Sequence, residues 1–296
     1  MLDELKHLCL VAETGTFTEA ARQAHLSQPA LSASIKRLEE QIGARLLDRG
    51  RRGAQLTAAG EALLPRARAM LADADAFGET AHALGAPLTG PLRLGVIPTI
   101  GPYLLPRVLP ALRKDFPELQ LFLREDLTSR LVAALDAGEL DVLLLAVDVD
   151  LGDLESLPLF SDPFVLAVPA GDTLAGCEGV GLESLAGRDV LLLEEGHCLR
   201  DQIVPLCATS GADESSGFRG TSLGTISQMV ASGLGVTLLP ELALERELAG
   251  AHGLATAEFG PEGPSRSIGL AWRKSSPRAE EFRALGATLA AAYARC

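Results

Sequence analysis

Cysteine is scarce in this chain, and its pattern does not suggest a permanent framework of disulfides. Only five of the 296 residues are cysteine, and they are scattered along the sequence in an odd number. Small secreted domains that depend on disulfides usually have denser cysteines in even numbers, so this class is disfavoured. No CxxC motif occurs and the five histidines are dispersed. We therefore expect no metal site and no cofactor. In a reducing compartment, a disulfide would be a signal.

Long apolar runs and an N-terminal signal pattern are also missing. The opening residues, MLDELKHLCLVAE, carry charges too early and too often for a signal peptide, and no apolar run reaches transmembrane length. We expect a soluble, cytoplasmic protein with no membrane partner. Tandem repeats, low-complexity tracts and a GxGxxG motif are missing as well. The length suggests two or three domains, and a hydrophobic content of 47% suffices for sizeable cores.

Positive charge is in short supply overall but gathers near the N-terminus. The formal net charge is −13. Residues 18–68 hold 9 Lys/Arg against 5 Asp/Glu, whereas residues 91–296 hold 16 against 28. A small basic segment on an acidic body indicates a local contact with nucleic acid, because phosphate repels the rest of the chain.

Local signals in the first 57 residues predict a helix-turn-helix with a wing. Apolar residues over positions 3–12 have helical spacing, and Thr16 and Glu19 form a potential capping box before a short second helix. A third helix begins after Ser27, a good N-cap, and ends before Gly43. The stretch LLDRGRRGAQLT then has the pattern of a β-hairpin.

A third helix in this position presents its N-terminal residues to the major groove of DNA, while basic residues bind phosphate. The expected contacts to base edges are Gln28, Pro29 and Ser32, and those to the phosphates are Lys36, Arg37, Arg51 and Arg52. The partner would be a double-stranded DNA operator. The alternative is an ordinary three-helix bundle with solvated arginines.

The next segment has a heptad pattern that predicts a dimerisation helix. Its seam, at alternating steps of four and three residues, consists of Leu63, Ala67, Met70, Ala74, Phe77, Ala81 and Leu84. Such a seam favours packing on a second copy of the helix. Packing on its own domain is the alternative, and Pro65 should kink the first turns.

From residue 89 onwards, apolar strand-like runs alternate with helical stretches. The runs are LRLGVI, LQLFLR, DVLLLAV, FVLAVPA, DVLLLEE and VTLLP. Alternation of this kind predicts an α/β fold with parallel sheets covered by helices. About two hundred residues can form two small subdomains with a cleft between them.

The order of these parts resembles that of LysR-type transcriptional regulators. The resemblance is carried by FTEAARQAHLSQPALSASIKRLEEQIGARLLDR and LTAAGEALL, and it extends over the remaining chain. It implies a winged helix-turn-helix, a linker helix and an effector domain with the two-subdomain fold of periplasmic binding proteins. The implied boundaries are 1–57 for the DNA-binding domain, 58–88 for the linker helix, 89–161 with 267–296 for effector subdomain I, and 162–266 for subdomain II.

Four motifs further resemble the peroxide-sensing members of that family. These are IPTIGPYLLP, GHCLRDQ, FRGTSLGTISQMVASGLGVTLLP and SRSIGLAWR. The resemblance implies a transcriptional activator that responds to hydrogen peroxide in oxidative stress and is not an enzyme. It assigns Cys198 as the peroxidatic cysteine, Cys207 as the resolving cysteine, and Thr99, Thr128, His197 and Arg266 as the peroxide pocket. Thr99 and Thr128 could instead be helix N-caps, and Arg266 could be a surface residue.

Reaction with peroxide requires a thiolate, and an ordinary cysteine with a pKa of ~8.5 is only a few per cent ionised at neutral pH. Cys198 follows a predicted strand and should begin a helix, whose N-terminus favours an anion. His197 and Arg200 supply donors nearby. We therefore expect the pKa of Cys198 to be lowered.

In the implied mechanism, Cys198 becomes a sulfenic acid, and Cys207 then condenses with it to form a disulfide. Nine residues of helix would separate the two cysteines by ~13 Å along the axis, on opposite faces. A disulfide needs Cα atoms within ~7 Å, so the helix would have to melt. Pro205 should weaken the helix or end it early, and the turn-prone ATSGADESSG that follows Cys207 could remodel cheaply. If Pro205 breaks the helix, the two cysteines could already lie close together.

The resemblance also implies partners. It suggests a homodimer that assembles into a homotetramer, contact with RNA polymerase, and re-reduction by glutaredoxin or thioredoxin. Two other functions stay open from the sequence. One is a LysR-type regulator that binds a small organic effector in the cleft between subdomains. The other is an enzyme, either a cysteine peroxidase or a Cys-His hydrolase. Of the remaining cysteines, we expect Cys9 in a core, Cys177 in a loop and Cys296 at the terminus.

Overall fold

The computed structural model describes residues 1–50, 53–83 and 88–294. The chain divides into two compact units. The N-terminal unit comprises Met1–Leu84 with Ala134–Glu139, and the effector unit comprises Gly85–Ala133 with Leu140–Cys296. In the described part of the chain, no helix is both long enough and apolar enough to cross a membrane. The predicted DNA contacts Arg51 and Arg52 lie outside the described residues.

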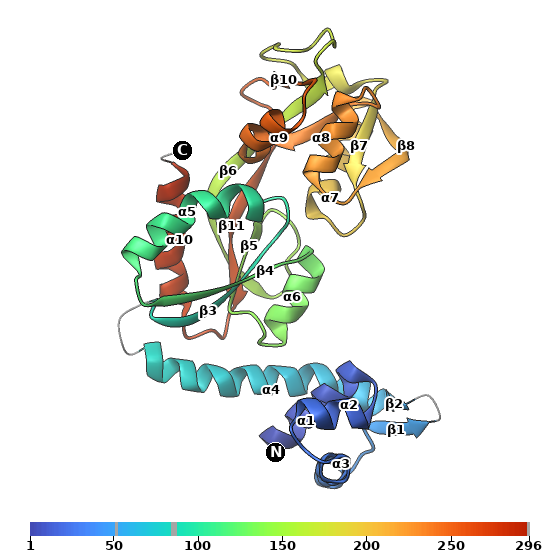
Figure 1. The fold of residues 1–296 in the computed structure, drawn as a ribbon, viewed down its shortest axis with the longest axis vertical. Coiled ribbons are helices and arrows are strands. Elements are labelled where there is room, and N and C mark those ends of the chain that lie inside the picture. Colours follow the sequence, from blue (N-terminus) through green and yellow to red (C-terminus); the bar gives the residue numbers. More distant parts are fainter. Residues whose placement is uncertain (51–52, 84–87, 295–296) are drawn as a thin grey trace. The chain divides into compact units, whose positions relative to one another are not determined.

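The N-terminal unit has the predicted winged helix-turn-helix arrangement (Figure 1). Its elements are α1 (Leu2–Thr14), α2 (Phe17–Gln23), α3 (Gln28–Ile42), the antiparallel strands β1 (Leu47–Gly50) and β2 (Gly53–Leu56), and α4 (Ala58–Ala83). Local chemistry sets the helix ends. Thr16 and Ser27 accept backbone N–H groups as N-caps, and Gly43 ends α3 in the left-handed region. These features confirm the predicted start of the second helix and the predicted start and end of the third.

Helix α4 continues through Pro65, which lies in its second turn. The first part of the predicted heptad seam packs on its own unit, because Ala67 is buried in the core with α1 and Leu63 packs against that core. Further along, Met70 is 47% exposed and Phe77 is 83% exposed. The predicted heptad seam therefore has two parts with different surroundings. Its start belongs to the DNA-binding core, which was the alternative interpretation, and its middle part faces away from that core.

The effector unit is built on a seven-stranded sheet and a two-stranded sheet. The large sheet has the order β10-β6-β11-β5-β3-β4, with β9 also paired to β6; the small one pairs β7 with β8. The strands are β3 (Gly90–Val96), β4 (Leu119–Glu125), β5 (Val142–Ala146), β6 (Leu154–Pro169), β7 (Asp189–Leu193), β8 (Asp213–Gly220), β9 (Thr237–Pro240), β10 (Leu254–Glu258) and β11 (Ser265–Arg273). The helices are α5 (Gly101–Asp115), α6 (Thr128–Asp136), α7 (Cys198–Ser210), α8 (Leu223–Ala231), α9 (Leu244–Gly250) and α10 (Ala279–Tyr293), with short 3₁₀ turns at Leu182–Leu185 and Glu241–Ala243.

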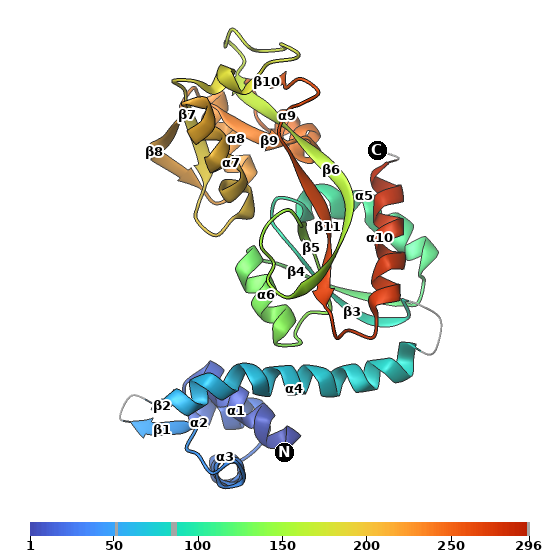
Figure 2. The same ribbon diagram turned by 180° about the vertical axis from the view of Figure 1, so that it is seen from behind.

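Two long strands join the two subdomains. Strands β6 and β11 pair antiparallel from Ser265 opposite Pro163 to Arg273 opposite Leu154. The first half of β6 lies in the sheet with β3–β5, whereas its second half pairs with β9 and β10. Figure 2 shows β6 and β11 running side by side from one subdomain into the other. Helices α5 and α10 cover one face of the part of the large sheet that contains β3, β4 and β5, and α6 lies over the other face of that part (Figure 1).

The expected parallel sheets are only partly present. Strand β3 is parallel to β4 and β5, and β7 is parallel to β8. The connecting strands β6 and β11 are antiparallel to their neighbours. The predicted parallel pairing does not extend to β6 and β11, because a buried strand gives a continuous apolar run whichever direction it takes. The turn-prone segment ADESSG was also misjudged, since Asp213–Gly220 forms β8 against β7.

Candidate redox site and DNA-binding surface

A sharp turn after β7 delivers Cys198 to the first position of a helix. The residues Val190–Leu193 of β7 are buried, which fixes the strand in the core of the second subdomain. Gly196 then adopts a φ of +95°, in the region that favours glycine. His197 is the N-cap residue and α7 begins at Cys198. The predicted strand-to-helix junction at Cys198 is therefore confirmed.

Cys198 lies in a small inner pocket between the two subdomains. Its side chain is 7% exposed. The pocket wall consists of Ile97, Pro98, Thr99, Leu127, Thr128 and His197. These side chains leave no space for a water molecule. The first five come from subdomain I and His197 from subdomain II, so the pocket depends on both. The structure thus brings Thr99, Thr128 and His197 together around the thiol, as the resemblance implied.

Arg266 is the buried cation beside this pocket. It is 1% exposed, which excludes the surface role that the sequence left open. Its Nε and Nη2 donate to Asp162 Oδ2 at 2.9 and 2.8 Å, and its Nη1 donates to Thr99 Oγ1 at 2.8 Å. Nη2 also reaches the Thr99 carbonyl at 3.0 Å. Thr99 is therefore a partner of Arg266 and not a helix cap, and Ile100 precedes α5 instead.

Thr128 presents its buried hydroxyl to the Cys198 thiol. Its Oγ1 is buried, and within the described part of the chain it makes no hydrogen bond of normal geometry. It is therefore not capping α6, where it is the first residue. The hydroxyl instead forms a side-chain hydrogen bond with the Cys198 thiol, and this contact lowers the pKa of that thiol. A buried hydroxyl that makes no hydrogen bond of normal geometry is costly to the fold.

The expected lowering of the pKa of Cys198 is wrong for this inner pocket. Burial raises the pKa of the thiol above its ordinary value, and this effect outweighs the lowering by Thr128 and Arg266. Asp148 and Asp201 add a smaller raising effect. Arg266 has less influence than its formal charge suggests, since Asp162 pairs with it in a fully buried ion pair. The net effect of these surroundings is therefore to raise the pKa of the thiol.

The other two donors expected beside Cys198 also behave differently from the expectation. Burial lowers the pKa of His197, which favours the neutral imidazole and leaves no cation there. Arg200 points away from the pocket. Its Nη2 is 2.7 Å from Glu214 Oε1 on β8, and its Nη1 is 3.5 Å from the Leu193 carbonyl. The position of Arg200 in the sequence could not reveal this ion pair, because Arg200 and Glu214 come together only when α7 packs on β8.

Cys207 lies on the same unbroken helix, nine residues beyond Cys198. Helix α7 runs through Pro205 to Ser210, so of the two effects expected of Pro205, an early end of the helix does not occur. The buried side chains of Ile203 and Cys207 hold this half of the helix against the subdomain. Nine residues of helix span ~13 Å, well beyond the ~7 Å of a disulfide. The four described cysteines are free thiols, and linking these two requires α7 to unwind.

The remaining cysteines match their expected surroundings where the structure describes them. Cys9 is buried in the core of the N-terminal unit. Cys177 lies in the loop after β6 and is partly exposed. Cys296 lies outside the described residues.

Three site residues were missed in the sequence. Asp162 balances Arg266, and its signal was a carboxylate just before the apolar run FVLAVPA, within the segment that forms β6. Gln202 lies one helical turn after Cys198, and its Nε2 donates to Asp148 Oδ1 at 2.7 Å. Gln202 Oε1 is buried and, in the described part of the chain, has no hydrogen-bonding partner. The i, i+4 spacing of Cys198 and Gln202 was a usable signal, whereas Asp148 could be found only from the fold.

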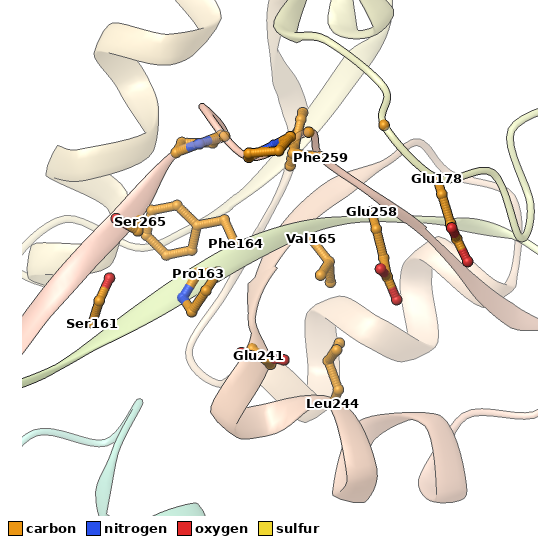
Figure 3. A pocket seen from close by; sticks show the side chains of 15 residues that line it. Ser161, Pro163, Phe164, Val165, Glu178, Glu241, Leu244, Glu258, Phe259 and Ser265 are labelled. Carbon is orange, nitrogen blue, oxygen red and sulfur yellow. The ribbon is translucent and has the colours of Figure 1, made fainter. Parts of the chain in front are cut away.

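An outer groove of about 630 Å³ reaches the same cysteine from the surface. Its wall is mainly apolar and consists of Thr128, Ser129, Val132, Val149, Asp150, Leu151, Gly152, Gly196, Cys198 and Asp201. A separate hollow of about 530 Å³ lies between β6 and the loop before β11, with three glutamates, Glu178, Glu241 and Glu258, around Phe164 and Phe259 (Figure 3). No residue of the predicted pocket lines that hollow.

Comparison with known families decides the class of protein. Residues 2–61 match the model for bacterial regulatory helix-turn-helix proteins of the lysR family, and residues 85–294 match the LysR substrate binding domain. The chain belongs to the LysR family of transcriptional regulators. It is therefore a DNA-binding regulator and not an enzyme.

The similar proteins within the LysR family are OxyR-type regulators. The DNA-binding transcriptional dual regulator OxyR of Escherichia coli K12 is 42% identical over 290 residues, covering 97% of this chain and 94% of that protein. A probable hydrogen peroxide-inducible genes activator of Streptomyces viridosporus is 44% identical over 292 residues, covering 97% and 93%. The structure of a cysteine-to-serine mutant of Corynebacterium glutamicum OxyR with bound hydrogen peroxide is 37% identical, with a TM-score of 0.70 over 100% of this chain and 93% of that one.

In this LysR family member, the start of α3 is the exposed part of the helix-turn-helix. Gln28 and Pro29 are exposed, and Ser32 is half-buried one turn later. The opposite face of α3 is buried through Leu31, Ile35 and similar residues. The three residues predicted to read bases therefore share the accessible side of the helix.

The two basic residues of α3 already have acidic neighbours. Lys36 Nζ lies 3.5 Å from Glu40 Oε1, and Arg37 Nε lies 3.5 Å from Glu4 Oε1. Both cations are more than half exposed. Exposed pairs of this length contribute little to stability, so either cation could turn to a phosphate at small cost.

Proposed function

We propose that this LysR family regulator senses hydrogen peroxide through Cys198 and Cys207. The observation that carries the proposal is the placement of a buried thiol beside the buried hydroxyl of Thr128 and the buried cation Arg266, with a second cysteine on the same helix. The peroxide named in the descriptions of similar proteins supports it.

The first chemical step is attack of the Cys198 sulfur on one oxygen of the peroxide. The O–O bond breaks, the sulfur gains an OH and becomes a sulfenic acid, and the other oxygen leaves as hydroxide, which takes the thiol proton to form water. Thr128 and the Arg266–Thr99 pair are the donors available to hold the leaving oxygen. Because the inner pocket has no free volume, peroxide would approach Cys198 through the outer groove, which Thr128 and Cys198 also line.

The second step is capture of the sulfenic acid by Cys207. The Cys207 thiolate attacks the Cys198 sulfur, a disulfide forms, and hydroxide leaves and is protonated to water. This step requires α7 to unwind, because the helix keeps the two sulfurs on separate faces. A local unfolding that is exchanged for a covalent bond gives two discrete states of the effector unit.

The DNA-bound assembly would transmit this change. We propose that α3 binds a double-stranded operator, with Gln28, Pro29 and Ser32 at base edges. A dimer through α4, doubled to a tetramer, would couple oxidation of the effector units to the spacing of the DNA-binding domains. RNA polymerase would be the downstream partner, glutaredoxin or thioredoxin the reductant, and the bacterial cytoplasm the compartment.

A second function is favoured by one observation. The outer groove of about 630 Å³ beside Cys198 is mainly apolar and larger than hydrogen peroxide needs. A small organic effector could occupy it and move the subdomains without any redox chemistry.

Substitution of Cys198 tests the choice between these functions. We expect Cys198→Ser to abolish the change in DNA footprint that one equivalent of peroxide causes in the wild-type protein. Cys177→Ser, at a partly exposed cysteine outside the pocket, is the matched control and should respond normally. A footprint change that survives in Cys198→Ser would favour the organic effector.

A further inference from the structure

A chain of four charged residues ties the start of α7 to β8. Arg200, in the first turn of α7, binds Glu214 at 2.7 Å. Glu214 also binds Arg219 at 3.3 Å, and Arg219 lies 3.5 Å from Glu195 in the turn before α7. We call these four residues the α7 clasp. It holds the segment that carries Cys198 on the strand that follows Cys207.

Within the clasp, the Arg200–Glu214 pair is the one removed from water. The side chain of Arg200 is 11% exposed and that of Glu214 is 32% exposed, whereas that of Arg219 is 46% exposed and that of Glu195 is 81% exposed. A charged pair in such a partly desolvated position contributes more than a surface pair, and loss of one partner leaves the other poorly compensated. The inner pair therefore has the larger effect on whether α7 stays folded.

Glu214 also acts on the resolving cysteine. Burial raises the pKa of Cys207, and the negative charge of Glu214 raises it further. Among the described residues, Glu214 is the charged group whose field acts on this thiol, from the strand against which α7 packs. The Glu214 carboxylate thus binds Arg200, which holds α7, and also raises the pKa of the Cys207 thiol, which must later attack Cys198.

We propose that Glu214 is a positioning residue that delays disulfide formation until α7 opens, by holding Arg200 in place and keeping Cys207 unreactive in the folded helix. The inference rests on the proposed function, because it concerns the second of the two chemical steps. It separates the two steps in time. Cys198 can react with peroxide in the folded state, whereas capture by Cys207 waits for the clasp to release.

The test measures the two steps separately in the full-length protein. One equivalent of hydrogen peroxide is added, samples are quenched over time with a sulfenic-acid-trapping reagent and a thiol-alkylating reagent, and peptides are quantified by mass spectrometry. We expect Glu214→Gln to form sulfenic acid at the wild-type rate and to convert it to disulfide about three- to tenfold faster, the range for loss of one partly buried charged interaction. Glutamine keeps the shape and an oxygen acceptor for Arg200, so the variant should fold.

Two further readouts distinguish this role from simple structural damage. The pH dependence of disulfide formation in Glu214→Gln should shift to lower pH, because a negative charge beside Cys207 is gone. The reduction potential of the disulfide should become more negative by up to about 30 mV, which is a tenfold change in the equilibrium constant. Arg200→Gln should change the potential in the same direction without the downward shift in pH dependence, because Glu214 remains beside Cys207.

Glu195→Gln is the matched control, since Glu195 binds only the outer cation of the clasp in the described structure. It should behave as wild type in both steps. Equal rates, potential and pH dependence for Glu214→Gln and wild type would overturn the inference alone. A wild-type protein that forms no Cys198–Cys207 disulfide would overturn the proposed function as well.

Discussion

Thr128 is the residue at which stability and sensing should separate most clearly. Its buried hydroxyl makes no hydrogen bond of normal geometry within the described part of the chain, so the fold gains little from it. We expect Thr128→Val to leave the free energy of unfolding unchanged within about 1 kcal/mol, or to raise it. The same change should slow sulfenic acid formation at Cys198 by about 10²- to 10³-fold, the typical loss of one donor to a developing oxyanion.

Thermal unfolding and the rate of sulfenic acid trapping test these two expectations. Thr225→Val is a suitable control, because Thr225 is an exposed threonine near the start of α8. Marked destabilisation together with normal peroxide reactivity in Thr128→Val would show that the hydroxyl serves the fold instead.

The raised pKa of Cys198 predicts a particular dependence on pH. A thiol whose pKa is above its ordinary value of about 8.5 stays largely protonated at neutral pH, and its thiolate fraction grows as pH rises. We expect the initial rate of sulfenic acid formation to rise about tenfold per pH unit from pH 6 to beyond 8. A rate that levels off below pH 7 would mean that the reacting state holds the thiolate, as the helix N-terminus had suggested.

At the scale of the element, Pro205 keeps α7 close to the point of unwinding. It has no N–H to donate to the carbonyl of Asp201, so the helix lacks one hydrogen bond between the two cysteines. We expect Pro205→Ala to stabilise the reduced effector unit by about 1–3 kcal/mol and to slow disulfide formation at constant peroxide. Formation of sulfenic acid should be unaffected. Val204→Ala, at an exposed position of the same helix, controls for general changes in α7. Equal disulfide rates for Pro205→Ala and wild type would contradict the argument.

Local chemistry made part of these elements predictable. Thr16, Ser27 and Gly43 mark helix ends by their own side chains or backbone, without help from distant residues. The end of α7 was not predictable in this way. From the sequence, Pro205 could either stop the helix or only weaken it, and burial of Ile203 and Cys207 against the second subdomain keeps the helix intact.

At the scale of the whole molecule, the exposed part of α4 should control assembly. Phe77 is 83% exposed and Met70 is 47% exposed, which is unusual for apolar residues on a seam unless a partner covers them. We expect Phe77→Asp to shift the protein toward monomers in sedimentation experiments without lowering the unfolding temperature of the N-terminal unit. An oligomeric state identical to that of wild type would remove α4 from the interface.

Long-range pairing is also where sequence reasoning about the site failed. Arg266 meets Asp162 across 104 residues, and Arg200 meets Glu214 only after α7 packs on β8. The cysteines and threonines of the pocket could be named because short motifs carry them. The charges that set their pKa values could not, since burial and partners are properties of the folded chain and not of a motif. This is why the identity of Cys198 was predictable and its ionisation was not.

A map of the cysteine linkages tests the central claim most directly. The full-length reduced protein is treated with one equivalent of hydrogen peroxide, alkylated, digested and analysed by mass spectrometry, with the untreated protein beside it. We predict a new peptide pair joined through Cys198 and Cys207 in the treated sample and free thiols at both positions in the untreated one. If both cysteines remain unlinked after the peroxide has been consumed, oxidation does not rebuild α7 and the account of peroxide sensing is wrong.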